Sequence, residues 1–230
     1  LYLGNWEAAE RYATEVISQT DLYHMEQELD KVFLVGSAEA IWQRLPDDIT
    51  GNALEATLFL ANAQYTHGVT DALLKAFSPD DQRRTQWIHL KDAETQLYVP
   101  YKYRVTGIAE SVEYSIILRL AEQYLIRAEA RAQRDDPAGA LIDLDVVRGR
   151  AGLDLLRETN PDLAGEALID SIFAERQREL FTEWGHRWLD LKRSGRVVEV
   201  LSALKPDFTA EDEWYPIPES EELRNPNLRK

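Results

Sequence analysis

The sequence contains no cysteine among its 230 residues, which excludes disulfide bonds, thiolate metal ligands and a cysteine nucleophile. It also contains no apolar run of about eighteen residues, so it predicts no helix that crosses a bilayer. The N-terminal LYLGNWEAAE is not typical of a signal peptide, because no basic segment precedes an apolar one. Many exported bacterial proteins also lack cysteine, so this absence does not decide the cellular compartment.

Basic residues are scarce relative to acidic ones. The chain carries 26 lysines and arginines against 41 aspartates and glutamates, which gives a formal net charge of -15. Such a charge opposes binding to phosphate backbones and to anionic membrane surfaces. We therefore expect no nucleic-acid partner.

Sequence motifs of common catalytic and cofactor sites are also missing. There is no HExxH, G-x-S-x-G, P-loop or G-x-G-x-x-G motif, and the histidines occur singly. We therefore predict no catalytic residue, no metal site and no cofactor. Several aspartates lie in a loop-rich region without the twelve-residue EF-hand pattern, which leaves open only a structural calcium ion bound by scattered oxygens. The histidines are His24, His67, His89 and His186, and the aspartates are Asp71, Asp80, Asp81 and Asp92.

Helical periodicity is clear in three segments. Residues 6–19 place Ala9, Ala13, Val16 and Ile17 on one side. Residues 115–134 have an apolar face made of Ile117, Leu120, Ala121, Tyr124, Leu125, Ala128 and Ala132. A third helix begins at Pro137, with Asp136 as its cap, and ends at Gly152.

The first and third helices share a pattern. Ala9, Ala13 and Val16 correspond to Ala140, Leu144 and Val147, each pair 131 residues apart. Small residues at a helix crossing and a turn before each helix are typical of tetratricopeptide hairpins. We predict such hairpins over 1–20 and 115–152, in an interrupted array rather than a regular solenoid.

Residues 21–113 lose this periodicity, apart from a strand-like run at 31–35 and a short strand or helix at 58–66. We predict long loops on a helical frame, where ligand-binding residues are often found. Aromatic residues collect there, and exposed rings can stack on the apolar face of a sugar. The candidate ligand-binding residues are Trp42, Tyr65, Trp87 and Tyr98. The alternative is that these rings fill a core beneath the loops.

The most charged stretch is AERQRELFTEWGHRWLDLKRSGR, residues 174–196. Glu175, Glu179 and Glu183 follow one another at four-residue spacing, which would suit an acid and base pair. Arg176 and Arg178 lie between them and favour ionised carboxylates, so we favour a charged packing helix over a catalytic site.

Several motifs together resemble the C-terminal half of the SusD/RagB family. They are ILRLAEQYLIRAEARAQ at 117–133, LDVVRGRAGL at 144–153, the charged stretch at 174–196 and WYPIPESEELRNPNL at 214–228. Secondary support comes from DQRR at 81–84, from PYKYR at 100–104 and from GNWEAAERYATEVI at 4–17. The resemblance covers nearly the whole chain in order.

This resemblance implies a mostly α-helical SusD-like fold, in which tetratricopeptide-type hairpins support long ordered loops with few short strands. Residues 1–230 would form one region, with 166–230 as C-terminal helices and an extended tail. The family consists of nutrient-binding outer-membrane lipoproteins of Bacteroidetes that take part in polysaccharide utilisation. Their partners are an oligosaccharide or other small nutrient and a SusC-like TonB-dependent transporter, and no catalysis is implied. The acidic net charge suits a neutral glycan better than a polyanion.

Family members carry a lipid anchor ahead of the matching region. We therefore expect the chain to be part of a longer, surface-exposed protein whose membrane contact is made only through that anchor. Leu1, Tyr2 and Leu3 run into Gly4 without a capping residue, as if the sequence began inside a helix.

Within the charged stretch, the resemblance indicates a scaffold role. We expect Leu180, Trp184, Trp188 and Leu191 in the core, and Glu179 or Glu183 and Asp190 paired with Arg187 or Arg193. Two other functions stay open: a tetratricopeptide scaffold that binds a protein segment, and a glycoside hydrolase with two carboxylates about 5 to 9 Å apart.

Overall fold

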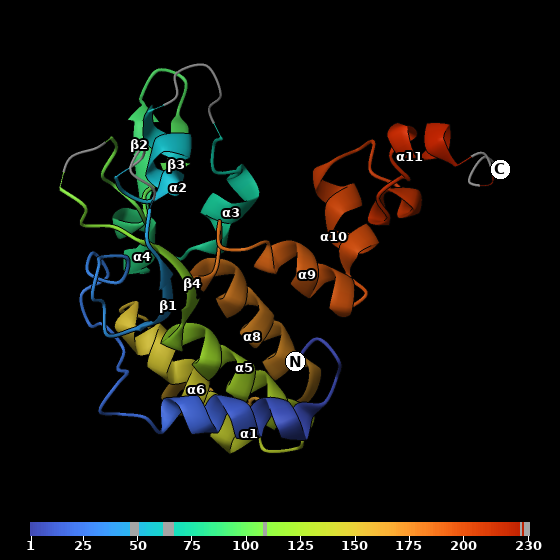
Figure 1. Ribbon diagram of the computed structural model, residues 1–230. Helices are drawn as coiled ribbons and strands as arrows, with labels where there is room; N and C mark the ends of the chain where they lie inside the picture. Colours follow the sequence, from blue (N-terminus) through green and yellow to red (C-terminus); the bar gives the residue numbers. More distant parts are fainter. Residues whose placement is uncertain (47–50, 62–66, 108–109, 226, 228–230) are drawn as a thin grey trace. The chain divides into compact units, whose positions relative to one another are not determined.

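The computed structural model describes residues 1–46, 51–61, 67–107, 110–225 and 227. It divides the chain into two compact units, Leu1–Arg187 and Trp188–Lys230, drawn together in Figure 1. Residues 1–230 were expected to form one region, whereas the division between the two units falls inside the charged stretch. Within the described residues, no helix combines the length and the apolar character needed to span a membrane.

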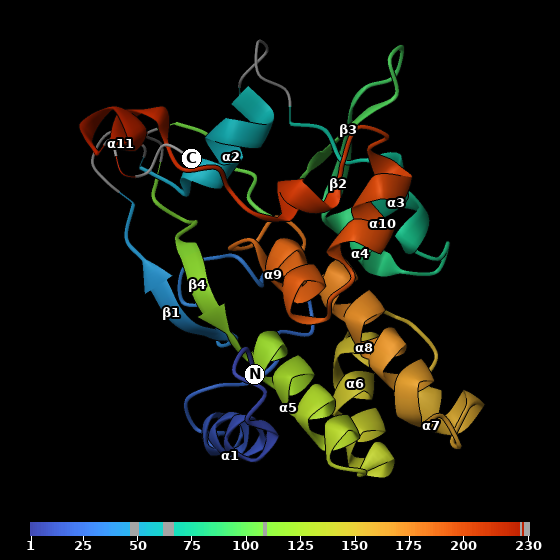
Figure 2. The ribbon, with the colours of Figure 1, turned by 90° about the vertical axis from the view of Figure 1, so that its right-hand side faces the viewer.

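Unit 1 is built on a helical layer that confirms the mostly α-helical prediction. In both Figure 1 and Figure 2 these helices lie together at one end of the unit, and the β2–β3 hairpin lies at the other. Helix α5 packs against α1, α6 and α8. The helices are α1 (Trp6–Ile17), α5 (Leu120–Gln133), α6 (Pro137–Arg150), the short α7 (Leu156–Thr159) and α8 (Gly165–Glu179).

Capping residues explain where two of these helices begin. The Asn5 side chain accepts the N–H of Ala8 at 3.0 Å and caps α1 at its start. Residues 1–4 form a turn, so the expectation that the sequence begins inside a helix is wrong. Asp136 caps α6 ahead of Pro137, as predicted, through a 2.9 Å bond from the N–H of Gly139. A second correction is that the helix predicted from residue 115 begins only at Leu120, because residues 115–119 form strand β4.

Small and branched apolar residues fill the core of this layer. Ala13, Leu144 and Val147 are all buried, in agreement with the pattern found at the 131-residue offset. The small alanines allow α1 and α6 to approach their neighbours closely. The cluster comprises Met25, Leu120, Ala121, Leu125, Ala128, Ala140, Leu141, Leu144, Val147, Leu168, Ile172 and Leu180.

The insertion between α1 and α5 holds short elements and two small sheets. Strand β1 pairs antiparallel with β4, with Ala40 opposite Arg119, and β2 pairs antiparallel with β3, with Ile88 opposite Pro100. The predicted strand at 31–35 is instead a turn with one bridge, from Leu34 to Glu113. The elements are β1 (Ala40–Arg44), α2 (Leu54–Ala56), the π-helical turn η1 (Thr57–Ala61), α3 (Asp71–Ala76), α4 (Gln82–Gln86), β2 (Ile88–Asp92), β3 (Leu97–Pro100) and β4 (Ser115–Arg119).

This insertion has a core of its own around aromatic rings. Phe33 contacts Trp87 and Tyr103 edge to face, at centroid distances of 5.5 and 5.1 Å. Phe77 and Phe181 form another such pair at 5.9 Å. Phe181 follows α8, so this core joins the insertion to the helical layer.

Unit 2 contains α10 (Val197–Leu204), the 3-10 turn η2 (Ala210–Glu213), α11 (Glu219–Arg224) and most of α9 (His186–Arg193). The ammonium of Lys192 lies 4.2 Å from the centroid of the Trp214 ring and 5.5 Å from that of Trp188. Its Nζ donates to the carbonyl of Glu213 at 3.1 Å. The tail expected to be extended therefore contains two short helices and packs on α9 through this lysine.

The two faces of α6 provide a test of the core. Leu144→Ala removes a fully buried side chain and should lower the free energy of unfolding by about 3 kcal/mol, because it leaves a cavity. The change is measured by urea denaturation followed by circular dichroism. Ile142→Ala, on the half-exposed face of the same helix, is the matched control and should cost well under half as much. Equal losses for the two variants would contradict this packing.

Candidate functional site

The aromatic residues expected to bind ligand do not form one platform. Trp87 is fully buried, and its Nε1 donates to the carbonyl of Leu29 at 2.9 Å. Its role as a ligand contact is therefore wrong: the ring belongs to the core, the alternative that the sequence left open. The backbone after α4 directs the ring inward, and loop-rich composition carries no information about that direction.

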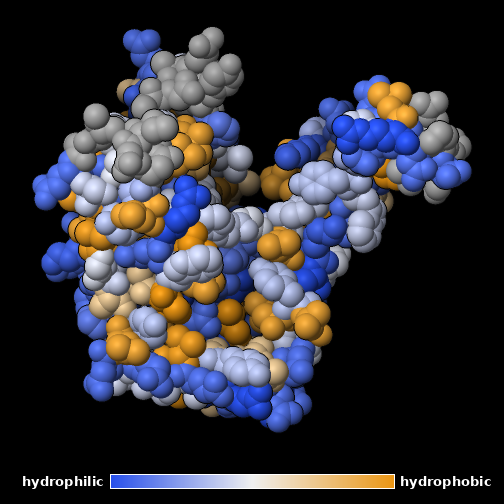
Figure 3. Space-filling view, in the orientation of Figure 1, coloured by the Kyte–Doolittle hydropathy of each residue, from blue (hydrophilic) through white to orange (hydrophobic). Residues whose placement is uncertain are grey.

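Two other expected residues lie in different sheets. Trp42 is 58% exposed on β1, whereas Tyr98 on β3 is partly buried against the aromatic core. Neither lines the pocket described next. Tyr65 lies outside the described residues. Figure 3 shows hydrophobic residues scattered among hydrophilic ones on the viewed face of unit 1.

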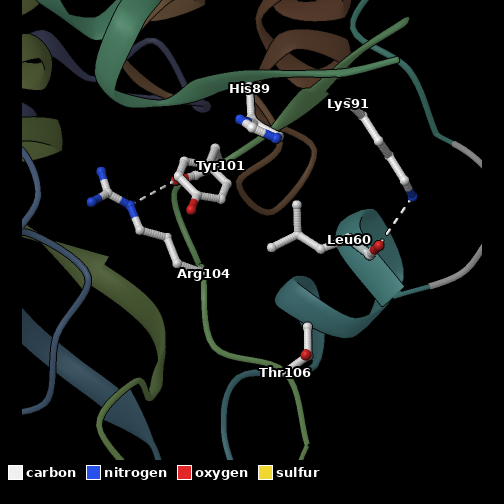
Figure 4. A pocket seen from close by; sticks show the side chains of 6 residues that line it. All are labelled: Leu60, His89, Lys91, Tyr101, Arg104 and Thr106. Carbon is white, nitrogen blue, oxygen red and sulfur yellow. Dashed lines mark hydrogen bonds between the residues drawn. The ribbon is translucent and has the colours of Figure 1, made fainter.

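A pocket of about 250 Å³ lies between η1 and the β2–β3 hairpin (Figure 4). We call it the ring pocket. Its lining consists of Leu60, His89, Lys91, Tyr101, Arg104 and Thr106. Three of these side chains are basic, and the sequence analysis assigned none of the six to a site.

Strand geometry brings the two rings of this pocket together. His89 and Lys91 are two residues apart on β2 and both line the pocket, and the register of the sheet shifts between Leu90 and Asp92. Val99 pairs with His89, so Tyr101, two residues further along, is a diagonal neighbour of His89. The N–H of Tyr101 donates to the carbonyl of Trp87 at 2.8 Å and extends the ladder. The rings of His89 and Tyr101 stack at 4.9 Å with an interplanar angle of 29°.

Arg104 is fixed over the same ring. Its guanidinium carbon lies 5.0 Å from the Tyr101 centroid, and Nη2 donates to the carbonyl of Gln86 at 2.9 Å. The backbone N–H groups of Arg104 and Val105 donate to the Glu113 carboxylate at 2.8 to 2.9 Å. Burial raises the pKa of Glu113, although these N–H groups oppose the shift. The segment that carries Arg104 is thus held by hydrogen bonds rather than by packing alone.

A second pocket of about 160 Å³ lies beside the end of α8. Its lining is Glu55, Tyr103, Ile116, Thr182, Glu183 and Trp184. Trp184 was expected in the core, but it is half exposed, and its Nε1 donates to the carbonyl of Ile116 at 2.7 Å. Thr182 and Trp184 have positive φ values of 60° and 42°, so the turn that presents Glu183 is strained.

Three carboxylates of the 174–196 stretch join charged residues from other parts of the chain in a buried ion cluster. Its members are Glu39, Asp81, Arg83, Lys102, Arg119, Arg150, Glu175, Glu179 and Glu183, all nearly inaccessible to solvent. Glu179 pairs with Arg83 at 2.9 Å and also with Arg119 and Arg150. The expected pairing of Glu179 or Glu183 with Arg187 or Arg193 is therefore wrong, because their partners come from other parts of the chain.

Glu183 completes this cluster on the side of the second pocket. Its carboxylate accepts a bond from Arg119 at 2.8 Å and pairs with Lys102. Lys102 also donates to the carbonyls of Glu179 and Phe181 at 2.7 and 3.0 Å. Asp190 pairs with Arg193 at 2.8 Å in unit 2, as expected.

Burial and charge pairing compete in setting the pKa values of the cluster. Burial alone would raise the pKa of Glu179, but Arg150, Arg119 and Arg83 outweigh it and hold that pKa well below its usual value. The same competition lowers the pKa of Glu183, with Arg119 and Lys102 as the main partners. Burial lowers the pKa of Lys102 to about 8, against the opposing effect of Glu183.

No group of three or more metal-ligating side chains occurs in the part of the chain that the structure describes. Asp81 forms a 2.8 Å pair with Arg83, and Asp92 accepts the N–H of Glu94 in the β2–β3 turn. These two aspartates therefore have roles in the local fold.

Both the sequence and the fold of this chain are similar to those of known proteins. The sequence profile of the SusD family matches residues 85–230, which is more than half of the chain. The chain belongs to the SusD family. A SusD-like protein of Formosa agariphila is 34% identical over 110 residues, which are 45% of this chain and 22% of that protein.

Solved structures share the fold of this SusD-family chain. A SusD superfamily protein of Parabacteroides distasonis matches with a TM-score of 0.75 and 20% identity, over 96% of this chain and 56% of that one. Surface glycan-binding protein A of Bacteroides thetaiotaomicron, in complex with laminarihexaose, matches with a TM-score of 0.72 and 19% identity, over 100% and 60%. The chain thus spans little more than half the length of these relatives.

Removing one charge from the buried ion cluster should destabilise unit 1. Glu179→Gln leaves three buried arginines without a shared carboxylate, and we expect the free energy of unfolding at pH 7 to fall by about 3 kcal/mol. The measurement is urea denaturation. Glu15→Gln, which removes an exposed carboxylate 3.9 Å from Arg11, is the control and should change stability by less than about 0.5 kcal/mol.

The pH dependence distinguishes the charge from the shape of this side chain. Because the folded-state pKa of Glu179 is depressed, its contribution is present above its ordinary value of 4.5 and is lost as the pH falls through the folded-state pKa. The stability of Glu179→Gln should therefore decline less steeply in acid than that of the parent. Parallel curves for the two proteins would show that Glu179 is not ionised in the fold.

Proposed function

We propose that this chain is part of a cell-surface protein that binds oligosaccharides without cleaving them. Its fold matches that of a glycan-binding protein solved with laminarihexaose, which supports a carbohydrate ligand. Rings and polar groups that converge on a pocket are the usual means of binding a sugar. The ring pocket is the described site that best combines these features.

The observation that carries this proposal is the stacked pair of His89 and Tyr101 at a pocket of about 250 Å³. His89 is exposed and Tyr101 is partly exposed, so a sugar ring can pack against them. Arg104 and Thr106 offer hydrogen-bonding groups for hydroxyls at the same place. Trp42, which is exposed on β1, is a second candidate for glycan contact, and the partly buried Tyr98 is a weaker one.

A glycoside hydrolase is less well supported. Glu55 and Glu183 both line the second pocket, and two carboxylates in one pocket are the side chains that an acid and base pair requires. The pKa of Glu183 is lowered, because Arg119 and Lys102 outweigh the effect of burial. A general acid needs the opposite shift. Glu55 accepts a 2.8 Å bond from Ser115. These contacts favour a structural role.

The family relationship supports two further parts of the proposal. The protein would lie at the outer membrane through a lipid anchor and would deliver its glycan to a SusC-like TonB-dependent transporter. The tetratricopeptide-like helices would then serve as the scaffold for contact with that transporter. Co-purification of the full-length protein with such a barrel tests this, and its failure would leave glycan binding as a separate question.

Tyr101 provides the direct test of glycan binding. Tyr101→Ala removes one ring of the stack and should raise the Kd for a bound oligosaccharide about fivefold, because an aromatic contact of this kind is worth roughly 1 kcal/mol. The Kd is measured by isothermal titration calorimetry against a glycan panel. The same titrations should release no reducing sugar.

A matched control exists on α1. Tyr12 is 57% exposed, and the guanidinium of Arg11 lies 4.6 Å from its ring centroid, much like Arg104 over Tyr101. Tyr12→Ala should leave the Kd unchanged. A loss of binding in Trp42→Ala with none in Tyr101→Ala would instead place the site on β1.

A further inference from the structure

The ring pocket carries a charge opposite to that of the chain. Its described lining contains three basic side chains, His89, Lys91 and Arg104, and no acidic one. The whole chain has 41 acidic and 26 basic residues, so such a lining is unlike the average surface. Local charge, rather than net charge, sets the potential that a bound ligand experiences.

The basic residues line the cavity from two sides. Figure 4 shows Arg104 on one side and Lys91 on the other, with Tyr101 and Leu60 between them, and the Arg104 guanidinium lies on the side of Tyr101 away from Leu60. The Nζ of Lys91 donates to the carbonyl of Leu60 at 3.0 Å, which positions the ammonium at the rim. The two cations come from different segments of the insertion, the β2 strand and the loop after β3.

The guanidinium of Arg104 is oriented before any ligand arrives. Nε and Nη2 donate to the carbonyls of Tyr101 and Gln86 at 3.4 and 2.9 Å. None of the described residues accepts a hydrogen bond from Nη1. A guanidinium whose plane is already fixed loses little freedom when it binds an anion.

The nearest carboxylate does not occupy the cavity. Glu113 is buried and accepts the backbone N–H groups of Arg104 and Val105. It is not among the residues that line the pocket. An anion that enters from solvent therefore meets cationic groups without a competing acidic side chain in the described lining.

We infer that the ring pocket selects a sugar that carries a negative charge, either a carboxylate or a sulfate ester. This inference rests on the proposed glycan-binding function and changes the expected ligand from a neutral glycan to an acidic one. The sugar ring packs against His89 and Tyr101, and its anionic group accepts charge-assisted hydrogen bonds from Arg104 and Lys91. Such bonds are about twice as strong as those from a neutral hydroxyl.

The test compares three oligosaccharides of equal length, one neutral, one with uronic acid carboxylates and one sulfated. Titration calorimetry on the full-length protein should give a Kd for at least one anionic ligand about tenfold or more below that for the neutral one. This advantage should shrink as salt is raised, because salt screens exposed charges. The two anionic arms decide between carboxylate and sulfate ester.

Two variants connect the preference to these side chains. Arg104→Gln and Lys91→Gln should each remove most of the advantage of the anionic ligand. Arg11→Gln, the matched guanidinium on α1, should keep it. Thermal unfolding of each variant verifies that the fold is intact, and Lys91→Gln preserves the test if Arg104→Gln is unstable.

The possible results distinguish a failure of the charge selectivity from a failure of the proposed glycan binding. Equal binding of neutral and anionic glycans, weakened alike by Tyr101→Ala, would overturn the charge selectivity and leave glycan binding in place. Binding of none of the three ligand classes would overturn both.

Discussion

The carboxylate of Glu179 binds three arginines that come from three different parts of the chain. Arg83 comes from α4, Arg119 from the end of β4 and Arg150 from the end of α6. Each charge is buried, so each requires the others to offset the cost of leaving water. Such a cluster adds little net stability compared with an apolar core of the same volume, but it permits few alternative arrangements. The insertion is positioned on the helical layer by these contacts.

The ring pocket depends on the same set of contacts. Trp87 points into the core, where the ammonium of Lys102 lies 4.8 Å from its ring, and the residues that follow Trp87 form β2. Lys102 and Tyr103 are buried, whereas Tyr101 and Arg104, which flank them in the sequence, line the pocket. The segment 100–104 thus has side chains in the interior of unit 1 and others in the binding surface. A displacement of the buried Lys102 would therefore shift Tyr101 and Arg104 as well.

Sequence reasoning predicted the frame better than the site. The 3.6-residue period, the cap at Asp136 and the repeated small residues identified α1, α5 and α6, because these signals are local. Strand β4 was mistaken for the start of a helix, since Ile117 and Leu120 are three residues apart, as on one face of a helix, and only the pairing with β1 reveals the strand.

The errors at the site have a common physical origin. Trp87 and His89 are two residues apart, yet one is buried and the other exposed, and that outcome depends on tertiary packing around β2. The partners of Glu179 lie 29 to 96 residues away, whereas the sequence analysis sought them among nearby arginines. Tyr101 was noted among the aromatic residues of the loop region and Arg104 within the PYKYR motif, but neither was assigned to a site. Their meeting with His89 requires the register of β2 against β3.

The order of the ion cluster along the chain has a consequence for synthesis. Arg83, Lys102, Arg119 and Arg150 all precede Glu175, Glu179 and Glu183. A chain that emerges from the ribosome therefore presents all four cations before these three carboxylates, and among the acidic members only Glu39 and Asp81 are made earlier. The contacts of Glu175 and Glu179 that join the insertion to the helical layer can form only after α8 has been made, so the support of the binding surface is completed late in synthesis.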